Sequence, residues 1–580
     1  MRTVTTLGLI LTGTLTSLTQ PMPTADQVRG DIGTRVDAYL TRLVPFGWSG
    51  AVLVARDGEV VLNKGYGLAN RAKNIPWTSD TVGNIGSITK QFTAAAILKL
   101  EAAGKLHVED PMATFLPGVP ADKAAITLHQ LLTHSSGLRG DLGGADDEPI
   151  GRDALVGRVL GSTLAHRPGE TFEYSNEGYS LLAAIVERVS TKSYEAFLHD
   201  ELFVPAGMTK TGYLLPAYAD DELARGYRAD GTDWGLIYRR GWRADGPGWY
   251  LTGNGGIQST TGDLYRWHLA LGNDSVLTAT ERAKLVTPYV PTPGGDVYAY
   301  GWGVEQTPRG TTVISHNGGN GIYFADFRRY VDENTVIIVL GNTPVIPATF
   351  LAMNRVEPLI FNPARVPMPP VIVASPAASR APLAGTYRLA SGGAVTIAPT
   401  VVGVRVDTAD LTVAALLQGF VPPAGRFADL EQKTRVIVAA SAKGDFQPVV
   451  DAYNGDRTLA QVRAGQGQDW LDWTRAFGDF AGFDLLGETF LQGDPVVVVR
   501  LRFAHGSAIA EYPWGPRRLL GFMGLEALPV AEFLPESPTS YVHFDYRRPT
   551  PVRLVFAETA HEVEVQISGD GGTIVAKRTR

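Results

Sequence analysis

The feature that most constrains the fold is a proline-rich stretch past the middle of the chain. Six prolines fall between Asn362 and Leu383. Proline fixes φ and has no backbone N–H to donate, so this composition predicts an extended linker over residues 362–383. The chain has 580 residues, which is too long for a single hydrophobic core. We therefore expect two main regions, residues 26–361 and residues 384–580, on either side of the linker.

The region before the linker has strands near its two ends and helices between them. Residues 26–44 carry apolar side chains at helical spacing. The runs Ser49–Arg56 and Val60–Tyr66 are joined by Asp-Gly, which is a hairpin signal. A strand that ends near 313–321 and the runs at 322–328 and 335–340 follow the helices. This order favours an antiparallel sheet flanked by helices, an α+β fold, over a doubly wound parallel sheet.

The region after the linker follows a different pattern. Short strand-like runs occupy residues 385–406 and return between 483 and 577, whereas residues 410–470 are mainly helical in pattern. Strands at both ends of a region can close a small barrel. We therefore expect a β-barrel region at 384–580, interrupted by an α+β insert at about 410–530.

Composition excludes several classes of function. The net charge of −7 and the pI of about 5.9 argue against nucleic acid as a partner. The chain has no cysteine, so disulfides and thiolate metal sites are absent. We find no zinc helix, phosphate loop or dinucleotide fingerprint, and we expect no metal and no cofactor.

The first 25 residues resemble a secretory signal peptide. Arg2 precedes a mildly apolar stretch from Val4 to Leu18, and small residues and prolines follow. The alternative is an unstructured cytosolic N-terminus. No later stretch reaches the roughly 18 uninterrupted apolar residues of a spanning helix, so we expect no integral membrane segment in the mature chain. The predicted location is periplasmic or extracellular.

The strongest candidate for chemistry is the pair Ser87 and Lys90. The segment opens into an apolar helix, Phe92–Leu100, with Ser87 at or just inside its first turn. Residues i and i+3 share a helix face, so the Lys90 amine can stand beside the Ser87 hydroxyl. Serine needs a base to become a nucleophile, and lysine is a base only where burial or positive charge lowers its pKa. Taken alone, such a pair is more often solvated surface.

Tyr174 and Asn176 could complete this chemistry. Tyr174 could pass protons between Ser87, water and a leaving group, and cationic neighbours would leave its phenol partly ionised. Asn176 could bridge Lys90 to a substrate carbonyl.

The third segment begins at His316. The glycines that follow, Gly318 and Gly319, would let a substrate lie flat along a strand edge. The N–H of Gly319 would be the second donor of an oxyanion hole, opposite the N–H of Ser87.

Together these motifs resemble a known superfamily. S-x-x-K at 87–90, Y-S-N at 174–176 and H-N-G at 316–318, in that order, are similar to serine β-lactamases and penicillin-binding proteins. Residues 131–138, 255–260 and 300–304 also resemble the branch that holds class C β-lactamases, D-alanyl-D-alanine carboxypeptidases, D-aminopeptidases and related esterases. The likeness covers about residues 26–360. It implies acylation of Ser87, proton transfer by Lys90 and Tyr174, and substrate orientation by Asn176 and His316.

A weaker resemblance concerns the region after the linker. Ala384–Tyr387, at the start of a strand, is similar to the lipocalin-like barrels that follow many members of this superfamily. The insert resembles a nuclear-transport-factor-like cone of helices and a curved sheet.

His316 departs from the β-lactamase pattern, in which lysine opens K-T-G. Histidine is only partly protonated near neutral pH, which lowers our expectation of β-lactamase activity. We expect a serine hydrolase that acts on an ester or amide, with a small or D-amino-acid-containing peptide as substrate. The alternatives are a penicillin-binding sensor or scaffold without efficient turnover, a class C-like β-lactamase, and a carbohydrate or lipid binder that uses the barrel.

Other polar and aromatic residues have structural interpretations. We expect His134 to be buried and to donate to backbone, and Glu173 and Asp326 to be structural. We expect Trp470 and Trp473 to lie in the core of the insert or to line a pocket there, rather than to bind a cofactor. Ser135 and Ser136 are typical turn formers.

Overall fold

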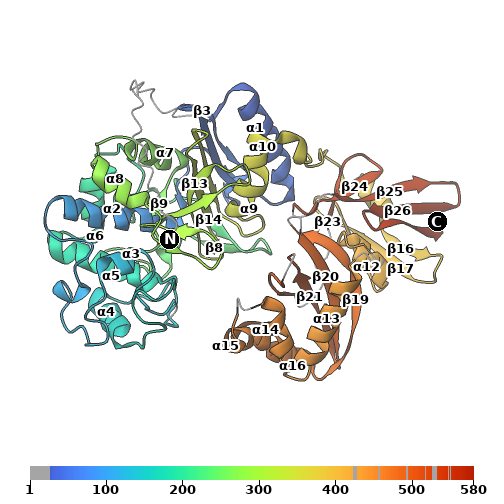
Figure 1. Ribbon diagram of the computed structural model, residues 1–580. Coiled ribbons are helices and arrows are strands. Elements are labelled where there is room, and N and C mark those ends of the chain that lie inside the picture. The colour runs from blue at the N-terminus through green and yellow to red at the C-terminus, as the bar shows by residue number, and fades with distance from the viewer. Residues whose placement is uncertain are drawn as a thin grey trace.

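The computed structural model describes residues 26–579, except 141, 422–426, 455–456, 492–493, 516–517, 526–531, 547 and 549. The predicted signal peptide therefore lies outside the described residues. Three bodies are visible along the chain (Figure 1). They are a large unit in which helices cover a sheet, a barrel that carries the C-terminus, and a smaller α+β unit beside the barrel. Within the described part of the chain, no helix is both long and apolar enough to cross a membrane.

A nine-stranded sheet organises the large unit, in the order β1-β3-β2-β15-β14-β13-β12-β11-β10. Every neighbouring pair is antiparallel, which confirms the predicted α+β fold. The strands are β1 (Gln27–Val28), β2 (Gly50–Arg56), β3 (Glu59–Tyr66), β10 (Val290–Pro291), β11 (Val297–Tyr298), β12 (Gly303–Gln306), β13 (Thr312–Gly319), β14 (Phe324–Tyr330) and β15 (Thr335–Gly341).

Helices cover both faces of this sheet, so its central strands are apolar on both sides. In β2, Ala51 and Leu53 face one core, whereas Val52 and Val54 face the other, as the two-residue repeat of a strand requires. The smaller layer consists of α1 (Gly30–Leu43), α9 (Ala348–Leu351) and α10 (Glu357–Phe361). The larger layer holds α2 (Thr89–Ala102), α3 (Leu128–Leu132), α4 (Arg152–Gly161), α5 (Asn176–Ser190), α6 (Tyr194–Leu198), α7 (Thr261–Ala270) and α8 (Ala279–Val286).

The C-terminal strands close a barrel, as predicted. It consists of β16 (Gly385–Leu389), β17 (Ala394–Pro399), β18 (Val404–Thr408), β23 (Glu532–Pro535), β24 (Ser540–His543), β25 (Val552–Glu558), β26 (Glu562–Gly569) and β27 (Gly572–Thr579). The helix α12 (Leu411–Leu417) packs Val413 and Leu416 into the barrel core, although the predicted insert range begins at about 410.

The insert itself runs between α12 and β23. It places α13 (Ala428–Ser441), α14 (Gln447–Tyr453), α15 (Leu459–Val462) and α16 (Gln468–Phe477) against a sheet of β19 (Phe480–Leu491), β20 (Asp494–Phe503), β21 (Gly506–Pro513) and β22 (Met523–Leu525). Trp470 and Trp473 are buried in its core, with ring centroids 6.1 Å apart.

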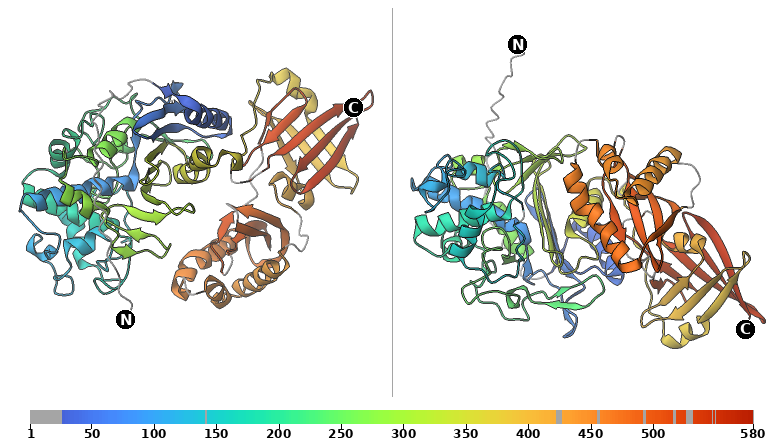
Figure 2. Two further views of the ribbon diagram at one scale, coloured as in Figure 1. Left: turned by 45° about the horizontal axis from the view of Figure 1, so that its top comes forward. Right: turned by 90° about the horizontal axis from the view of Figure 1, so that it is seen from below.

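Figure 2 shows the barrel and the insert on the same side of the large unit. Three described residues that follow β24 contact the large unit or the insert. The centroid of the Phe544 ring lies 5.1 Å from that of Phe46, and the centroid of the Tyr546 ring lies 4.8 Å from that of Phe350. Phe46 and Phe350 both lie on the side of the sheet that α1, α9 and α10 cover. The Arg548 guanidinium donates to Thr489 Oγ1 of the insert at 2.6 Å. The barrel side therefore contacts the helical layer that covers the sheet face opposite α2.

Candidate active site

Ser87 lies in a tight 3-10 turn, η2 (Gly86–Ile88), immediately before α2. The prediction placed it at the first turn of the helix, and the structure places it one turn earlier. Ser87 is partly exposed, whereas the residues on either side of it are buried. Ser87 is therefore the accessible residue of an otherwise buried segment.

Lys90 is fully buried, and its amine touches three oxygens. Nζ lies 3.0 Å from Ser87 Oγ, 2.7 Å from Asn176 Oδ1 and 2.9 Å from the Asn254 carbonyl oxygen. Burial holds the pKa of Lys90 well below its usual value, and the Asp146 and Glu177 carboxylates only partly oppose this. In the neutral amine, two N–H groups serve the two carbonyl oxygens, and the lone pair is left for the Ser87 O–H. This is the arrangement that a general base requires.

Tyr174 lies beside the same pair, but the ionisation of its phenol differs from the prediction. Burial raises the pKa of the Tyr174 phenol, and its hydrogen bond with Ser87 lowers it less. Lys90 Nζ lies over the ring, 4.7 Å from its centroid. The expectation of a partly ionised phenol is therefore wrong, because burial outweighs the effect of the neighbouring groups. A neutral phenol can still accept and donate one proton.

The helix start of α5 fixes Tyr174 and Asn176 in place. The Ser175 hydroxyl caps this helix by accepting from the Gly178 N–H at 3.2 Å. His134, fully buried, accepts the Ser175 N–H at Nδ1 (3.1 Å), and its ring centroid lies 4.2 Å from that of Tyr174. We expected His134 to donate to backbone. The direction is the reverse, because the backbone group that it meets is an N–H.

The end of β13 packs directly on η2, the turn that holds Ser87. A Cβ at Gly318 would stand 2.1 Å from the Ile85 carbonyl oxygen and 2.6 Å from Ser87 N. A Cβ at Gly86, whose φ is +50°, would stand 2.5 Å from Gly319 N. Glycine is therefore required on both sides of this contact. The close approach brings the backbone segments that carry Ser87 N and Gly319 N together, and an oxyanion hole needs two such N–H donors.

His316 is buried and uncharged. Its Nδ1 lies 2.6 Å from the Asn317 carbonyl oxygen, which can only accept, so Nδ1 carries the proton. Nε2 then accepts from the Tyr298 hydroxyl at 2.9 Å. Burial is the main cause that lowers the pKa of His316, to about 4. The expected partial protonation near neutral pH is therefore wrong.

The ionisation of His316 can be measured directly. Because its pKa is about 4, we expect its ring nitrogens to keep constant NMR shifts between pH 5.5 and 8, with the pattern of an Nδ1–H tautomer. The spectrum of His316→Gln identifies the resonance among the ten histidines. A titration midpoint between pH 6 and 7 would contradict the neutral assignment.

The sequence motifs do not identify two residues that contribute to the site. Asn254 immediately precedes the motif at 255–260, but only the fold shows that its carbonyl meets Lys90. Tyr298 sits on β11, a strand of two residues, which is too short to give a periodic pattern.

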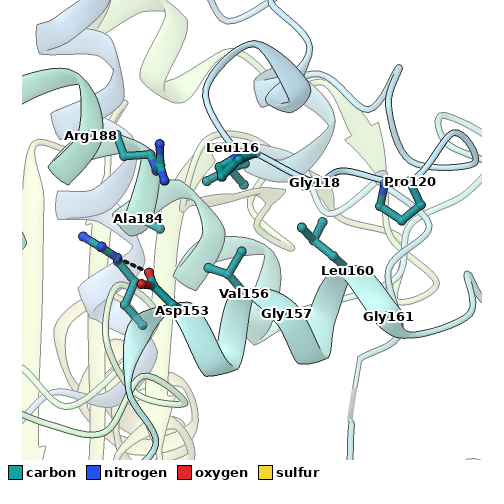
Figure 3. Close-up of a pocket in the computed structure, with 12 residues that line it drawn as sticks. Leu116, Gly118, Pro120, Asp153, Val156, Gly157, Leu160, Gly161, Ala184 and Arg188 are labelled. Carbon is teal, nitrogen blue, oxygen red and sulfur yellow. Dashed lines mark hydrogen bonds and ion pairs between the residues drawn. The ribbon is translucent and has the colours of Figure 1, made fainter.

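Other residues that we considered have partners elsewhere. Asp326 is buried and forms an ion pair with Arg328 at 3.0 Å, and Glu173 lies 3.6 Å from His166. A groove of about 510 Å³ lies along α4, lined among others by Val156, Leu160 and Arg188 (Figure 3). No residue of the site described above lines it.

The amino-acid sequence matches a known family. The sequence model of the family described as Beta-lactamase matches residues 47–359, more than half of the chain. A penicillin-binding protein of Bacillus subtilis (strain 168) is 30% identical over 309 residues, covering 51% of this chain and 68% of the relative. PbpX of the same organism is 32% identical over 278 residues, covering 48% of this chain and 66% of the relative.

Two solved structures share the fold. The octameric penicillin-binding protein homologue from Pyrococcus abyssi has a TM-score of 0.52 and 20% identity, covering 94% of this chain and 100% of that chain. A D-amino acid amidase from Ochrobactrum anthropi SV3 has a TM-score of 0.50 and 21% identity, covering 58% of this chain and 100% of that chain. Because the family model matches residues 47–359, more than half of the chain, the chain belongs to the Beta-lactamase family.

Proposed function

We propose that this protein is a serine hydrolase that cleaves an ester or an amide through an acyl-enzyme on Ser87. The observation that carries the proposal is the 3.0 Å contact between Ser87 Oγ and the amine of Lys90, a base whose pKa burial lowers. Lys90 accepts the Ser87 proton as Oγ attacks the carbonyl carbon. Tyr174, neutral and next to Ser87, relays a proton to the leaving group.

The other site residues receive the substrate in this proposal. The N–H groups of Ser87 and Gly319 stabilise the developing oxyanion. Asn176, already bonded to Lys90, offers its amide N–H₂ to the substrate. The backbone at Gly318 lets an extended substrate lie against β13. Water then attacks the acyl carbon, and Lys90 and Tyr174 handle its proton in turn.

The proposed substrate is a small or D-amino-acid-containing peptide, or a related ester. Neutral His316 supports this choice over a β-lactam, because a substrate carboxylate would find no fixed charge there. We also propose that the protein is exported, on the basis of its first 25 residues.

Covalent labelling tests the nucleophile. We expect a fluorophosphonate to add one mass equivalent to the wild type and none to Ser87→Ala, because the phosphorus–oxygen bond forms at Ser87 Oγ. Intact-mass spectrometry gives the result, and peptide mapping locates the adduct. Equal labelling of the variant would refute Ser87 as the nucleophile.

Turnover tests the enzyme against its alternative. With p-nitrophenyl acetate we expect steady release of nitrophenol after any burst. A stoichiometric burst without further release would instead support a penicillin-binding sensor. A penicillin adduct that is not hydrolysed would support the same alternative, and rapid hydrolysis of penicillin would support a β-lactamase.

A further inference from the structure

His134 occupies an unfavourable position for a histidine. Its φ is +56°, in the left-handed region that residues other than glycine rarely adopt, and its ring is buried. Because Nδ1 accepts the Ser175 N–H, Nε2 must carry the proton of the neutral ring. This second N–H has no hydrogen-bond partner among the described residues, and an unpaired buried donor is costly. An apolar side chain would fill the space without that cost, so packing alone does not explain a histidine here.

His134 holds the backbone on both sides of Tyr174. The His134 carbonyl oxygen accepts the Glu173 N–H at 2.7 Å, and His134 Nδ1 accepts the Ser175 N–H at 3.1 Å. These two donors belong to the residues immediately before and after Tyr174. One residue, 41 positions before Ser175 in the sequence, therefore fixes the path of the chain through Tyr174.

The His134 ring also packs on the Tyr174 ring. The two ring centroids lie 4.2 Å apart, with an angle of 36° between the planes. Lys90 Nζ lies 4.7 Å from the centroid of the same Tyr174 ring. With its backbone held on both sides and its ring in contact with His134, the phenol has little freedom to leave the neighbourhood of Lys90 and Ser87.

We propose that His134 is a positioning residue that holds Tyr174 where its phenol can pass a proton to the leaving group. This inference rests on the proposed function, which gives Tyr174 that task. As the bond from the acyl carbon to the leaving atom breaks, the Tyr174 O–H proton moves to the leaving atom. The proton that Lys90 took from Ser87 then returns the phenol to its neutral form. His134 exchanges no proton, because its Nδ1 lone pair is occupied by the Ser175 N–H.

The dependence of the rate on the leaving group tests this inference, because a loss of packing alone would not change it. A p-nitrophenolate leaves readily without a proton, whereas a p-methoxyphenolate is more basic and gains more from protonation. We measure kcat/KM for the two phenyl acetates. Tyr174→Phe should lose about a hundredfold to ten-thousandfold with the p-methoxyphenyl ester, the usual contribution of a general acid, and much less with the p-nitrophenyl ester.

His134→Leu should reproduce this selective loss. We expect about a hundredfold with the p-methoxyphenyl ester, the cost of misplacing a reacting group by about 1 Å, and less than about tenfold with the p-nitrophenyl ester. The double variant with Tyr174→Phe should be no more selective than Tyr174→Phe alone, because residues that act through one another do not have additive effects. His134→Asn should recover most of the loss, since asparagine tolerates a positive φ and its Oδ1 can accept the Ser175 N–H.

His268→Leu is the matched control. His268, on α7, also accepts at Nδ1, from Arg329 Nε at 3.1 Å, and its ring stacks on Tyr265 with the centroids 5.6 Å apart. No residue of the site described above is among these partners. This variant loses the same kind of contacts as His134→Leu, so it should keep the wild-type ratio between the two esters.

The outcomes separate the inference from the proposed function. If Tyr174→Phe is selective but His134→Leu slows both esters equally, or if the double variant adds the two losses, the inference is overturned and Tyr174 keeps its role. If Tyr174→Phe is not selective, the role that the proposed function gives to Tyr174 fails, and the inference fails with it. Should His134→Leu not fold, His134→Gly takes its place, because glycine fits a φ of +56° and also lacks the ring and its acceptor.

Discussion

Replacement of Lys90 with methionine should lower kcat/KM for p-nitrophenyl acetate by about a hundredfold to ten-thousandfold, the usual contribution of a general base. Methionine has a similar length and apolar stem, so the cavity stays filled, but it cannot accept the Ser87 proton. Steady-state kinetics measures the loss. A variant that keeps its activity within tenfold of the wild type would show that another group serves as the base.

Lys90→Met should also change how folding stability depends on pH, and the direction of that change can be predicted. The folded-state pKa of Lys90 is lowered, so between that pKa and 10.5 the unfolded chain binds a proton that the folded chain does not. Stability contributed by this group therefore rises with pH over that window. Lys90→Met should raise the thermal midpoint relative to the wild type at pH 7, and the difference should shrink as pH approaches 10. An unchanged difference would mean that Lys90 is charged when folded.

The sequence was sufficient for the architecture because the strong periodic patterns are the ones that build it. The hairpin of β2 and β3 and the late strands β14 and β15 are long enough to show two-residue alternation or continuous burial. The short strands β10 to β12 were not predicted, because two to four residues carry no period. Their pairing is decided by contacts with the rest of the sheet.

Part of the site can likewise be predicted from the sequence, and part of it cannot. Ser87 and Lys90 are three residues apart, so local geometry alone places them together. The Asn254 carbonyl is 164 residues from Lys90, and only folding brings it there. The errors at Tyr174 and His316 have one cause. Ionisation depends on burial and on partners distant in sequence, and residue type alone does not give either.

The second large prediction concerns the contact between β13 and η2, the turn that holds Ser87. Gly318→Ala would place a methyl group 2.1 Å from the Ile85 carbonyl oxygen and 2.6 Å from Ser87 N, both backbone atoms that cannot rotate away. The strand must therefore move, and the Gly319 N–H moves with it. We expect kcat/KM to fall by about a hundredfold to a thousandfold, as for loss of one oxyanion donor. Overpacking should also cost about 1–3 kcal/mol of folding stability.

Gly303→Ala on the neighbouring strand β12 is the matched control. Gly303 pairs with Ser315 in the register of the same sheet, but a Cβ there would meet its nearest atom, the Ser315 carbonyl oxygen, at 3.5 Å. That distance is ordinary van der Waals contact, so this variant should keep near wild-type activity. Ester hydrolysis and thermal unfolding of the two variants are measured in parallel. If Gly318→Ala is as active as Gly303→Ala, the position of the Gly319 N–H does not affect the reaction. The oxyanion would then be stabilised by the Ser87 N–H together with a different donor.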